Sequence, residues 1–277
     1  MKHEENGFYY GLNLDTHQKI ICERSKLKNP NGFIFGTSGS GRVETARREV
    51  AQIIKHANDE VVILDCDGEY EQSGLKYGVK NDMFIDLKGE IAQFNLTADD
   101  DAYHINLMDL VIDGSNNEIS NKCDMVTAFF EVFVKRPLSQ SEKNIIHDAV
   151  KTVLAPFAEE LKRNNLNYSP ESNPTLSDVL LLLEMTHHDE IEENEFLKLV
   201  LREKRDYFKA FEYHTNIPDG KAIEIEWHGM SCKLEVMTYV TCVDYVRNKM
   251  LLNNISEQRK NIYVYWDDVH LVLNDKP

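Results

Sequence analysis

Residues 33–43 read Phe-Ile-Phe-Gly-Thr-Ser-Gly-Ser-Gly-Arg-Val, and this stretch decides the fold. A short apolar run ends at Gly36, three glycines follow one another closely, and a helical pattern begins at Arg42. A strand, a flexible loop and a helix N-terminus in this order can cradle a phosphate, because the first N–H groups of the helix attract an anion. We therefore predict a strand at 33–35. The apolar positions of the helix that follows are Ala46, Val50, Ile53, Ile54 and Ala57.

The glycine spacing is that of the P-loop, GxxxxGK[ST], and runs from Gly36 to Gly41. The residues expected at a nucleotide's phosphates are Gly36, Thr37, Ser38, Gly39, Ser40, Gly41, Arg42 and Val43. Arg42 replaces the lysine of the motif, and a planar guanidinium is not equivalent to a compact ammonium. Val43 replaces the hydroxyl residue that binds Mg²⁺, and valine has no oxygen to offer. The alternative is a glycine-rich turn that binds nothing.

A second motif lies near the end of the sequence. The apolar run Ile262–Trp266 is followed by Asp267 and Asp268, as expected for a strand that ends in acidic residues beside a P-loop. We predict that this run is a central strand of the sheet. The alternative is that both aspartates are solvated acids at a strand end. For Asp67 and Glu69, which follow a predicted strand at 60–64, turn and capping roles are favoured over chemistry.

The rest of the chain predicts an α/β core interrupted by helices. Helical spacing dominates from Ser120 to Tyr213, and Ser139 with Glu142 reads as a capping box that opens a helix. Further elements are expected as strands at 8–13, 18–22, 83–87 and 222–227 and as a helix at 231–252, the first two strands forming a hairpin at the sheet edge. We predict a nucleotide-binding core at 1–119 and 214–277, with a helical insertion at 120–213.

Composition limits the partners of the chain. A net charge of −16 and a pI near 5.1 argue against a stand-alone nucleic-acid binder, which needs a concentrated basic surface. The five cysteines are widely spaced without a CxxC pair, as is typical of reduced thiols in the cytosol. No apolar run has membrane-spanning length, so we expect membrane association only through partners. The adjacent His187 and His188 point apart on a helix, which disfavours a metal site.

With both motifs placed, the chain resembles the large motor ATPase of conjugative type IV secretion systems, within the HerA and FtsK group of P-loop ATPases. The resemblance is greatest to versions from integrative mobile elements of Gram-positive bacteria. It rests on residues 8–13, 26–32, 36–43, 47–49, 67–70, 105–109 and 267–270. It implies a RecA-like P-loop fold with a central, mostly parallel sheet and an inserted all-α subdomain. It also implies hexameric assembly, other type IV secretion components as partners, and a cytoplasmic location beside the membrane-bound transfer channel.

The resemblance implies ATP and Mg²⁺ as cofactors and a role for each acid. Asp267 matches the aspartate that holds Mg²⁺ through water. Asp268 stands where the family has a glutamate that polarises the attacking water, and it is one methylene shorter. Because a misplacement of about 1 Å can cost about 100-fold in rate, this exchange alone could silence hydrolysis. The family's later strands, with a glutamine sensor and an arginine finger, and its membrane-proximal domain have no counterpart here, so we expect an excised piece or a shortened relative.

Three hypotheses follow. The first is a RecA-like domain of a conjugation ATPase with lost or weakened turnover and an architectural role, because the phosphate lysine, the metal hydroxyl and the water-polarising glutamate are all altered. The second is an active ATPase that drives conjugative DNA or protein translocation, since Arg42 keeps the positive charge. The third is a nucleotide-independent adaptor whose helical insertion at 120–213 binds another secretion component.

Overall fold

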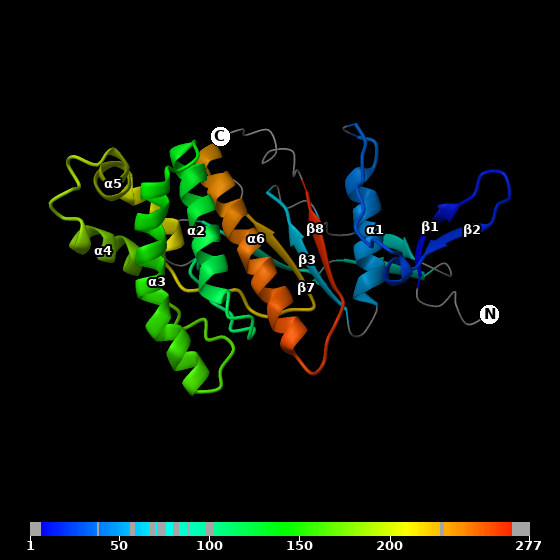
Figure 1. Ribbon diagram of the computed structural model, residues 1–277. Coiled ribbons are helices and arrows are strands. Elements are labelled where there is room, and N and C mark those ends of the chain that lie inside the picture. Colours follow the sequence, from blue (N-terminus) through cyan, green and yellow to red (C-terminus); the bar gives the residue numbers. More distant parts are fainter. Residues whose placement is uncertain are drawn as a thin grey trace.

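Four parallel strands form a sheet in the middle of the computed structural model (Figure 1). The strands are β3 (Glu60–Leu64), β6 (Ala92–Asn95), β7 (Ala222–Glu226) and β8 (Ile262–Trp266), in the order β6-β7-β3-β8. The structure describes residues 7–37, 39–55, 59–66, 70, 76–79, 83–87, 89–97, 102–227 and 230–267. The α/β class is therefore confirmed. Ser38, Asp67, Glu69 and Asp268, which the sequence singled out, lie outside the described residues.

Helices cover both faces of the sheet (Figure 1). Helix α1 (Arg42–Ile54) packs on one face, where Val61 and Ile63 of β3 join its apolar residues in a common core. Helix α6 (Cys232–Ile255) packs on the other face against Val62 and Leu64. Because a parallel sheet is buried on both sides, its strands are continuous apolar runs, which is why β3 could be predicted from sequence.

The amino end of α1 lies at the edge where the parallel strands end (Figure 1). The glycine loop therefore stands beside the carboxyl ends of the strands. Ligands of open α/β sheets bind at this edge, because helix N-termini and strand-end side chains converge there.

Two predictions about the sheet are wrong. Residues 33–35 form no strand, and β8 lies at the edge of the four-stranded sheet instead of in its centre. The physical reason is the same for both: β8 pairs with β3 on one side, and a cavity separates its other side from the segment that contains residues 33–35. A strand forms only where a neighbour completes its hydrogen bonds, and among the described residues no strand pairs with residues 33–35.

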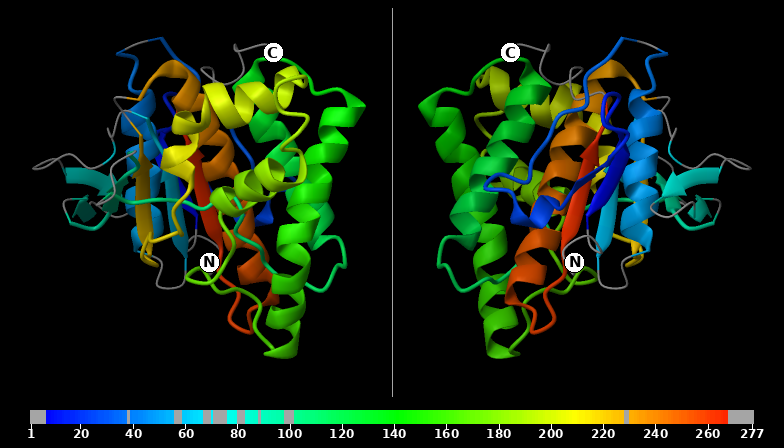
Figure 2. Two further views of the ribbon diagram at one scale, coloured as in Figure 1. Left: turned by 90° about the vertical axis from the view of Figure 1, so that its left-hand side faces the viewer. Right: turned by 90° about the vertical axis from the view of Figure 1, so that its right-hand side faces the viewer.

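The other strands form two small antiparallel pairs outside the main sheet. The predicted hairpin is confirmed as β1 (Phe8–Leu12) and β2 (Lys19–Cys22), but it does not extend the main sheet. It attaches to α1 instead, where the Tyr9 N–H donates to Gln52 Oε1 at 2.6 Å. The strand predicted at 83–87 is β5 (Met83–Asp86), paired with β4 (Lys76–Val79), which the sequence analysis missed. Both views in Figure 2 place this pair on the opposite side of the molecule from α3.

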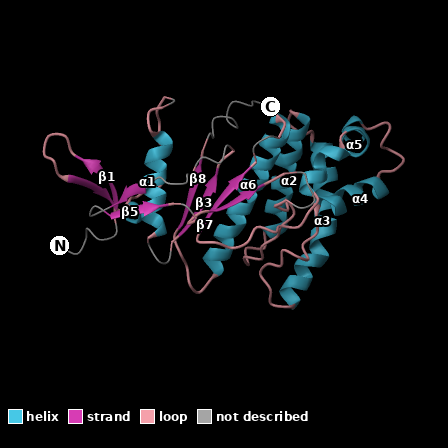
Figure 3. Ribbon diagram, turned by 180° about the vertical axis from the view of Figure 1, so that it is seen from behind, coloured by secondary structure: helices cyan, strands magenta, loops and turns pink. Residues whose placement is uncertain are grey.

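Helices fill the part of the molecule beyond α6 (Figure 3). They are α2 (Glu118–Val134), α3 (Gln140–Arg163), α4 (Leu176–Thr186) and α5 (Glu195–Lys198), followed by a π-helical turn (Leu199–Glu203) and a 3-10 helix (Arg205–Phe211). A short 3-10 helix, Arg24–Lys26, follows β2. The capping box is confirmed, since Ser139 and Glu142 accept each other's backbone N–H groups. Among the described residues, no helix combines the length and apolar character that a bilayer crossing demands.

A buried polar network joins this helical part to the sheet part. Lys122 of α2 pairs with Asp244 of α6 and also donates to the Leu107 carbonyl at 3.0 Å, while both charged side chains are at most 2% exposed. Asp109 accepts hydrogen bonds from Tyr168, Asn173 and Thr215 at 2.6–2.9 Å. Contacts so far apart in sequence fix the two parts to each other.

Candidate functional site

The glycine loop has the backbone conformation that only glycine adopts readily. Gly39 has φ +74° and Gly41, the residue before α1, has φ +85°, both in the left-handed region. The Ser40 N–H donates to the Thr37 carbonyl at 3.0 Å, so the loop turns back on itself. Gly36 lies so close to Ser40 and Arg42 that a side chain at position 36 would clash with both. The loop is thus a compact turn over the first N–H groups of α1, which have no partner within the helix.

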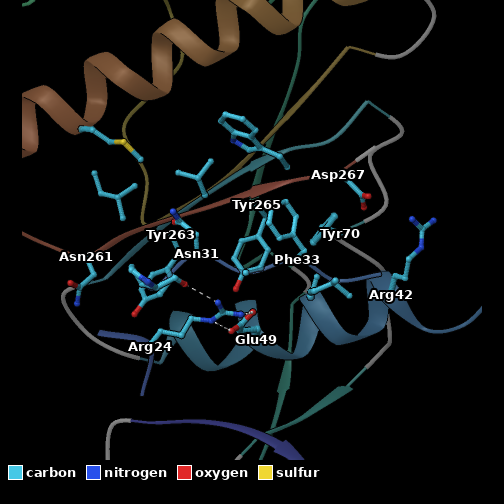
Figure 4. Close-up of a pocket in the computed structure, with 18 of the residues that line it drawn as sticks. Arg24, Asn31, Phe33, Arg42, Glu49, Tyr70, Asn261, Tyr263, Tyr265 and Asp267 are labelled. Carbon is cyan, nitrogen blue, oxygen red and sulfur yellow. Dashed lines mark hydrogen bonds and ion pairs between the residues drawn. The ribbon is translucent and has the colours of Figure 1, made fainter. Parts of the chain in front are cut away.

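A cavity of about 790 Å³ opens beside this loop (Figure 4). Phe35, Arg42 and Val43 line it from the loop side, and Tyr265 and Asp267 line it from β8. The two motifs predicted from sequence therefore face one cavity. Gly36, Thr37, Gly39, Ser40 and Gly41 form the loop behind this lining, while Ser38 and Asp268 lie outside the described residues. Whether any of them contacts a nucleotide remains a prediction.

The loop suits an anion better than a magnesium ion. The free N–H groups at the start of α1 and the guanidinium of Arg42 can hold a phosphate without any further side chain. Val43 gives no oxygen, and the nearby Thr45 hydroxyl donates to the Gly41 carbonyl at 2.9 Å. Within the described part of the chain, no three His, Cys, Asp or Glu side chains are grouped so that they could hold a metal ion. Among the described residues, the loop thus offers a phosphate its backbone N–H groups and the Arg42 guanidinium, but it offers no hydroxyl oxygen at position 43.

Asp267 has a partner inside the protein. Tyr70 is 3% exposed, and burial, with the negative charge of Asp267 and a hydrogen bond to it, raises the pKa of the Tyr70 hydroxyl. A neutral tyrosine therefore donates to the carboxylate that the sequence analysis assigned to magnesium. Tyr70 was grouped with the acids of 67–70, but nothing in the sequence indicated this contact, because the two residues are far apart along the chain.

Further acids lie near Asp267 on the same face of the sheet. Glu224, in the middle of β7, is fully buried and accepts hydrogen bonds from the Tyr70 N–H and from Gln93, each at 3.0 Å. Burial, with repulsion from Asp65 and Glu226, raises the pKa of Glu224 to about 7 from an ordinary value of 4.5. This carboxyl can therefore take up a proton near neutral pH.

The stability of the protein is expected to depend on pH through Glu224. Between pH 4.5 and 7 the native carboxyl holds a proton that the unfolded chain releases. The contribution of this proton to the free energy of unfolding is therefore complete below pH 4.5 and is lost as the pH rises through 7. Glu224→Gln keeps an acceptor but removes the charge. Urea unfolding at pH 5 and at pH 8 measures the effect. From pH 5 to pH 8, the free energy of unfolding of the native chain should fall by about 1–3 kcal/mol more than that of the variant. An equal loss in both proteins would show that Glu224 does not titrate in this range.

A second cluster at the cavity was not visible in the sequence. Arg24 pairs with Glu49 of α1 at 2.5 Å (Figure 4). It also donates to the Tyr10 hydroxyl at 3.1 Å and to the Pro30 carbonyl at 3.0 Å. The Glu49 side chain is only 2% exposed, so the pair is largely removed from water. Arg24 thereby fixes the chain at Pro30, just before the loop, to the second turn of α1. Glu49 belongs to the stretch 47–49 on which the family resemblance rests, but nothing in the sequence indicated that Arg24 is its partner.

Comparisons with known proteins agree with this geometry. A family model described as "Helicase HerA, central domain" matches residues 32–227. The solved structure of VirB4 of Thermoanaerobacter pseudethanolicus matches with a TM-score of 0.72 and 15% sequence identity, over 99% of this chain and 70% of that one. At this identity the likeness concerns the fold, and it confirms the RecA-like architecture. No curated protein matches the chain.

Proposed function

The chain belongs to the family of HerA helicase central domains, and we propose that it is the RecA-like domain of a conjugative DNA-transfer ATPase whose nucleotide turnover is lost or severely weakened. Its role is then architectural, at the cytoplasmic base of a type IV secretion channel. The fold shared with VirB4 supports the comparison with secretion machinery. Other secretion components are the partners, and hexameric assembly follows the family.

One observation supports this proposal: the described loop offers backbone N–H groups and a guanidinium to an anion, whereas Val43 offers no oxygen to a metal ion. Gly39 and Gly41 keep the loop conformation, and Arg42 faces the cavity. Val43 faces the same cavity without an oxygen, and Asp267 accepts a hydrogen bond from Tyr70. Phosphoryl transfer depends on a metal ion to neutralise developing charge, so the loss of its ligand weakens catalysis before it weakens phosphate contact.

The two parts of the chain have separate tasks in this proposal. The core at 1–119 and 214–277 holds the altered nucleotide site, and the helical insertion at 120–213 presents a surface to other secretion components. The insertion contributes most of a large apolar core, built from α2, α3, α4, α5 and the segments after α5, to which residues 107–112 and Met237 of α6 also belong. A well-packed unit of this kind can keep a binding surface in shape without nucleotide.

Hydrolysis of Mg·ATP tests the proposal directly. The native chain is expected to release phosphate no faster than the Asp267→Ala variant, because the site supplies no adequate metal position. Purified protein at several concentrations should be assayed, so that any dependence on assembly is seen. The second hypothesis, an active translocating ATPase, is supported by Arg42, which lines the cavity and keeps the positive charge of the P-loop lysine. It predicts turnover that Asp267→Ala abolishes, and that result would overturn our proposal.

A further inference from the structure

Three lysines meet where α2 ends and α6 begins. Lys135 directly follows α2, Lys204 stands just before the 3-10 helix Arg205–Phe211, and Lys233 lies in the first turn of α6. Helices α2 and α6 pack side by side (Figure 1). Because the lysines come from three separate elements, the fold and not the local sequence brings them together.

Aromatic rings hold two of these lysines in place. The Lys233 Nζ lies 3.8 Å from the centroid of the Phe133 ring, which is fully buried. The Nζ atoms of Lys233 and Lys204 lie 5.5 Å and 5.4 Å from the centroid of the Tyr207 ring, which is 38% exposed. A ring face attracts a cation through its quadrupole but carries no net charge. The rings therefore position both ammonium groups and leave their positive charge in place.

The lysine cluster has no counter-charge within the described part of the chain. None of Lys135, Lys204 and Lys233 has a carboxylate within ion-pair distance there. Burial lowers the pKa of the Lys233 ammonium, and the positive charges of Lys204 and Lys135 lower it further. The chain as a whole has 47 acidic and 31 basic residues, so carboxylates are plentiful elsewhere. A cluster of like charges in so acidic a protein leaves its positive charge available to an external anion.

The backbone of Lys135 gives an independent indication. Its φ is +56°, in the left-handed region, at the position after a helix where glycine is the favoured residue. After α3, the residue with the same backbone conformation is Asn165, and asparagine tolerates this region better than lysine. The backbone therefore does not explain the lysine at position 135, whereas a role for its charge beside Lys204 and Lys233 does.

The surroundings of the cluster define the anion. Arg136 pairs with Glu142 at 2.7 Å, and Arg202 and Arg205 share Glu184 at 3.1 and 2.9 Å. The uncompensated charge is thus confined to the lysines and does not continue as the basic track that a nucleic-acid backbone needs. Lysine binds phosphate as a point charge, whereas planar carboxylates favour the arginine fork. A short anion of high charge, built from phosphate groups, fits this surface.

From these observations we propose that Lys135, Lys204 and Lys233 bind an anion of two or more linked phosphate groups. The start of α6 assists, because its first N–H groups receive no cap from the Ser231 side chain. Free polyphosphate and the phosphate tail of a nucleotide share this chemistry. The site is separate from the glycine loop, since α1 and α6 cover opposite faces of the sheet. It holds whether or not that loop binds nucleotide.

Lysine acetylation, located by mass spectrometry, tests the proposal. The 277-residue chain receives a short pulse of acetic anhydride at constant ionic strength, with and without tripolyphosphate. Tripolyphosphate should slow the labelling of Lys204 and Lys233 about tenfold, because a bound anion raises the pKa of an ammonium and one unit lowers the free amine tenfold. Lys162, exposed near the end of α3, should be labelled at an unchanged rate. Equal slowing at all three lysines, or at none, would overturn the proposal.

Two further anions identify the source of the phosphates. If ATP slows the labelling as much as tripolyphosphate does, the phosphate tail of a nucleotide occupies the site, and if ATP does not, the ligand is a free polyphosphate. A single-stranded oligonucleotide that protects both lysines better than tripolyphosphate, at equal phosphate concentration, would contradict the proposal in favour of a nucleic acid.

Matched variants separate binding from structure. Lys135→Gly suits the left-handed backbone, so it should fold normally and bind tripolyphosphate about fivefold more weakly, as for one lost charge pair. Asn165→Gly makes the same kind of backbone change at φ +53° without removing a charge, and it should bind like the native chain. Arg42→Ala, at the glycine loop, should leave the protection of Lys233 unchanged. Undiminished binding by Lys135→Gly, or protection lost in Arg42→Ala, would refute this site.

Discussion

Lys122→Met is expected to lower the free energy of unfolding by about 3–5 kcal/mol, because it leaves the charge of Asp244 buried without its partner. Asp244 is 1% exposed, and among the described residues its Oδ1 has no hydrogen bond and only a long contact with Arg247 at 3.9 Å, so little else balances its charge. The Leu107 carbonyl also loses its donor. Urea denaturation at pH 7, followed by circular dichroism, measures this loss. A change below about 1 kcal/mol would show that water reaches the pair.

The matched controls separate charge from packing. Lys122→Met/Asp244→Leu removes both charges and should recover most of the lost stability, since replacing a whole buried pair by apolar groups is often neutral. Asn248 still has an acceptor in that variant, the Asp109 carbonyl at 3.1 Å. Lys151→Met, on the exposed side of α3, should change stability by less than about 0.5 kcal/mol. A double variant no more stable than Lys122→Met would mean that packing, and not charge, is lost.

The second large effect concerns the loop itself. Arg42→Lys/Val43→Ser restores the P-loop pattern, and we expect it to raise the affinity for Mg·ATP at least about tenfold over the native chain, since a hydroxyl beside the phosphates supplies a metal ligand. Gly39 and Gly41 have φ angles of +74° and +85°, so the double variant leaves the glycines that turn the loop unchanged. Fluorescence titration with a labelled ATP analogue, with and without Mg²⁺, measures the gain.

A paired variant isolates the metal ligand. Arg42→Lys/Val43→Ala has the same lysine but no hydroxyl, so its affinity should not respond to Mg²⁺. If the affinity of this variant for Mg·ATP rises as much as that of Arg42→Lys/Val43→Ser, then the lysine and not the metal position limits binding. If neither variant gains, the loop is a turn that joins two segments, which was the alternative interpretation of its sequence.

What the sequence predicted correctly was set by local chemistry. The apolar run at 60–64 is long enough only for a buried strand. Ser139 and Glu142 are three residues apart, so each side chain can accept the backbone N–H of the other at the start of a helix. Arg42, Val43 and Asp267 line one cavity, because strand ends and helix starts meet at one edge of a parallel sheet, and the nucleotide role assigned to them stays a prediction. Strand β6 has only four residues, with Gln93 and Asn95 among them, so it forms no continuous apolar run and was missed for that reason.

What the sequence could not predict depends on distant partners. Residues 33–35 have a strand's composition, but whether they form one is decided by a neighbour beside them, which is absent among the described residues. The contacts of Tyr70 with Asp267, Arg24 with Glu49 and Lys122 with Asp244 join separate elements and leave no local pattern. The chemically decisive features of the site are mostly of this kind.

Calorimetric titration of the native chain with ATP, in excess Mg²⁺ and again in excess chelator, tests the central claim most directly. The claim is that the loop keeps its anion-binding backbone while the metal position is altered, as Val43 and the Tyr70 partner of Asp267 indicate. We expect weak binding with the same dissociation constant in both conditions. Binding that tightens at least about tenfold on adding Mg²⁺ would contradict this account, because it would mean that the site holds the metal after all.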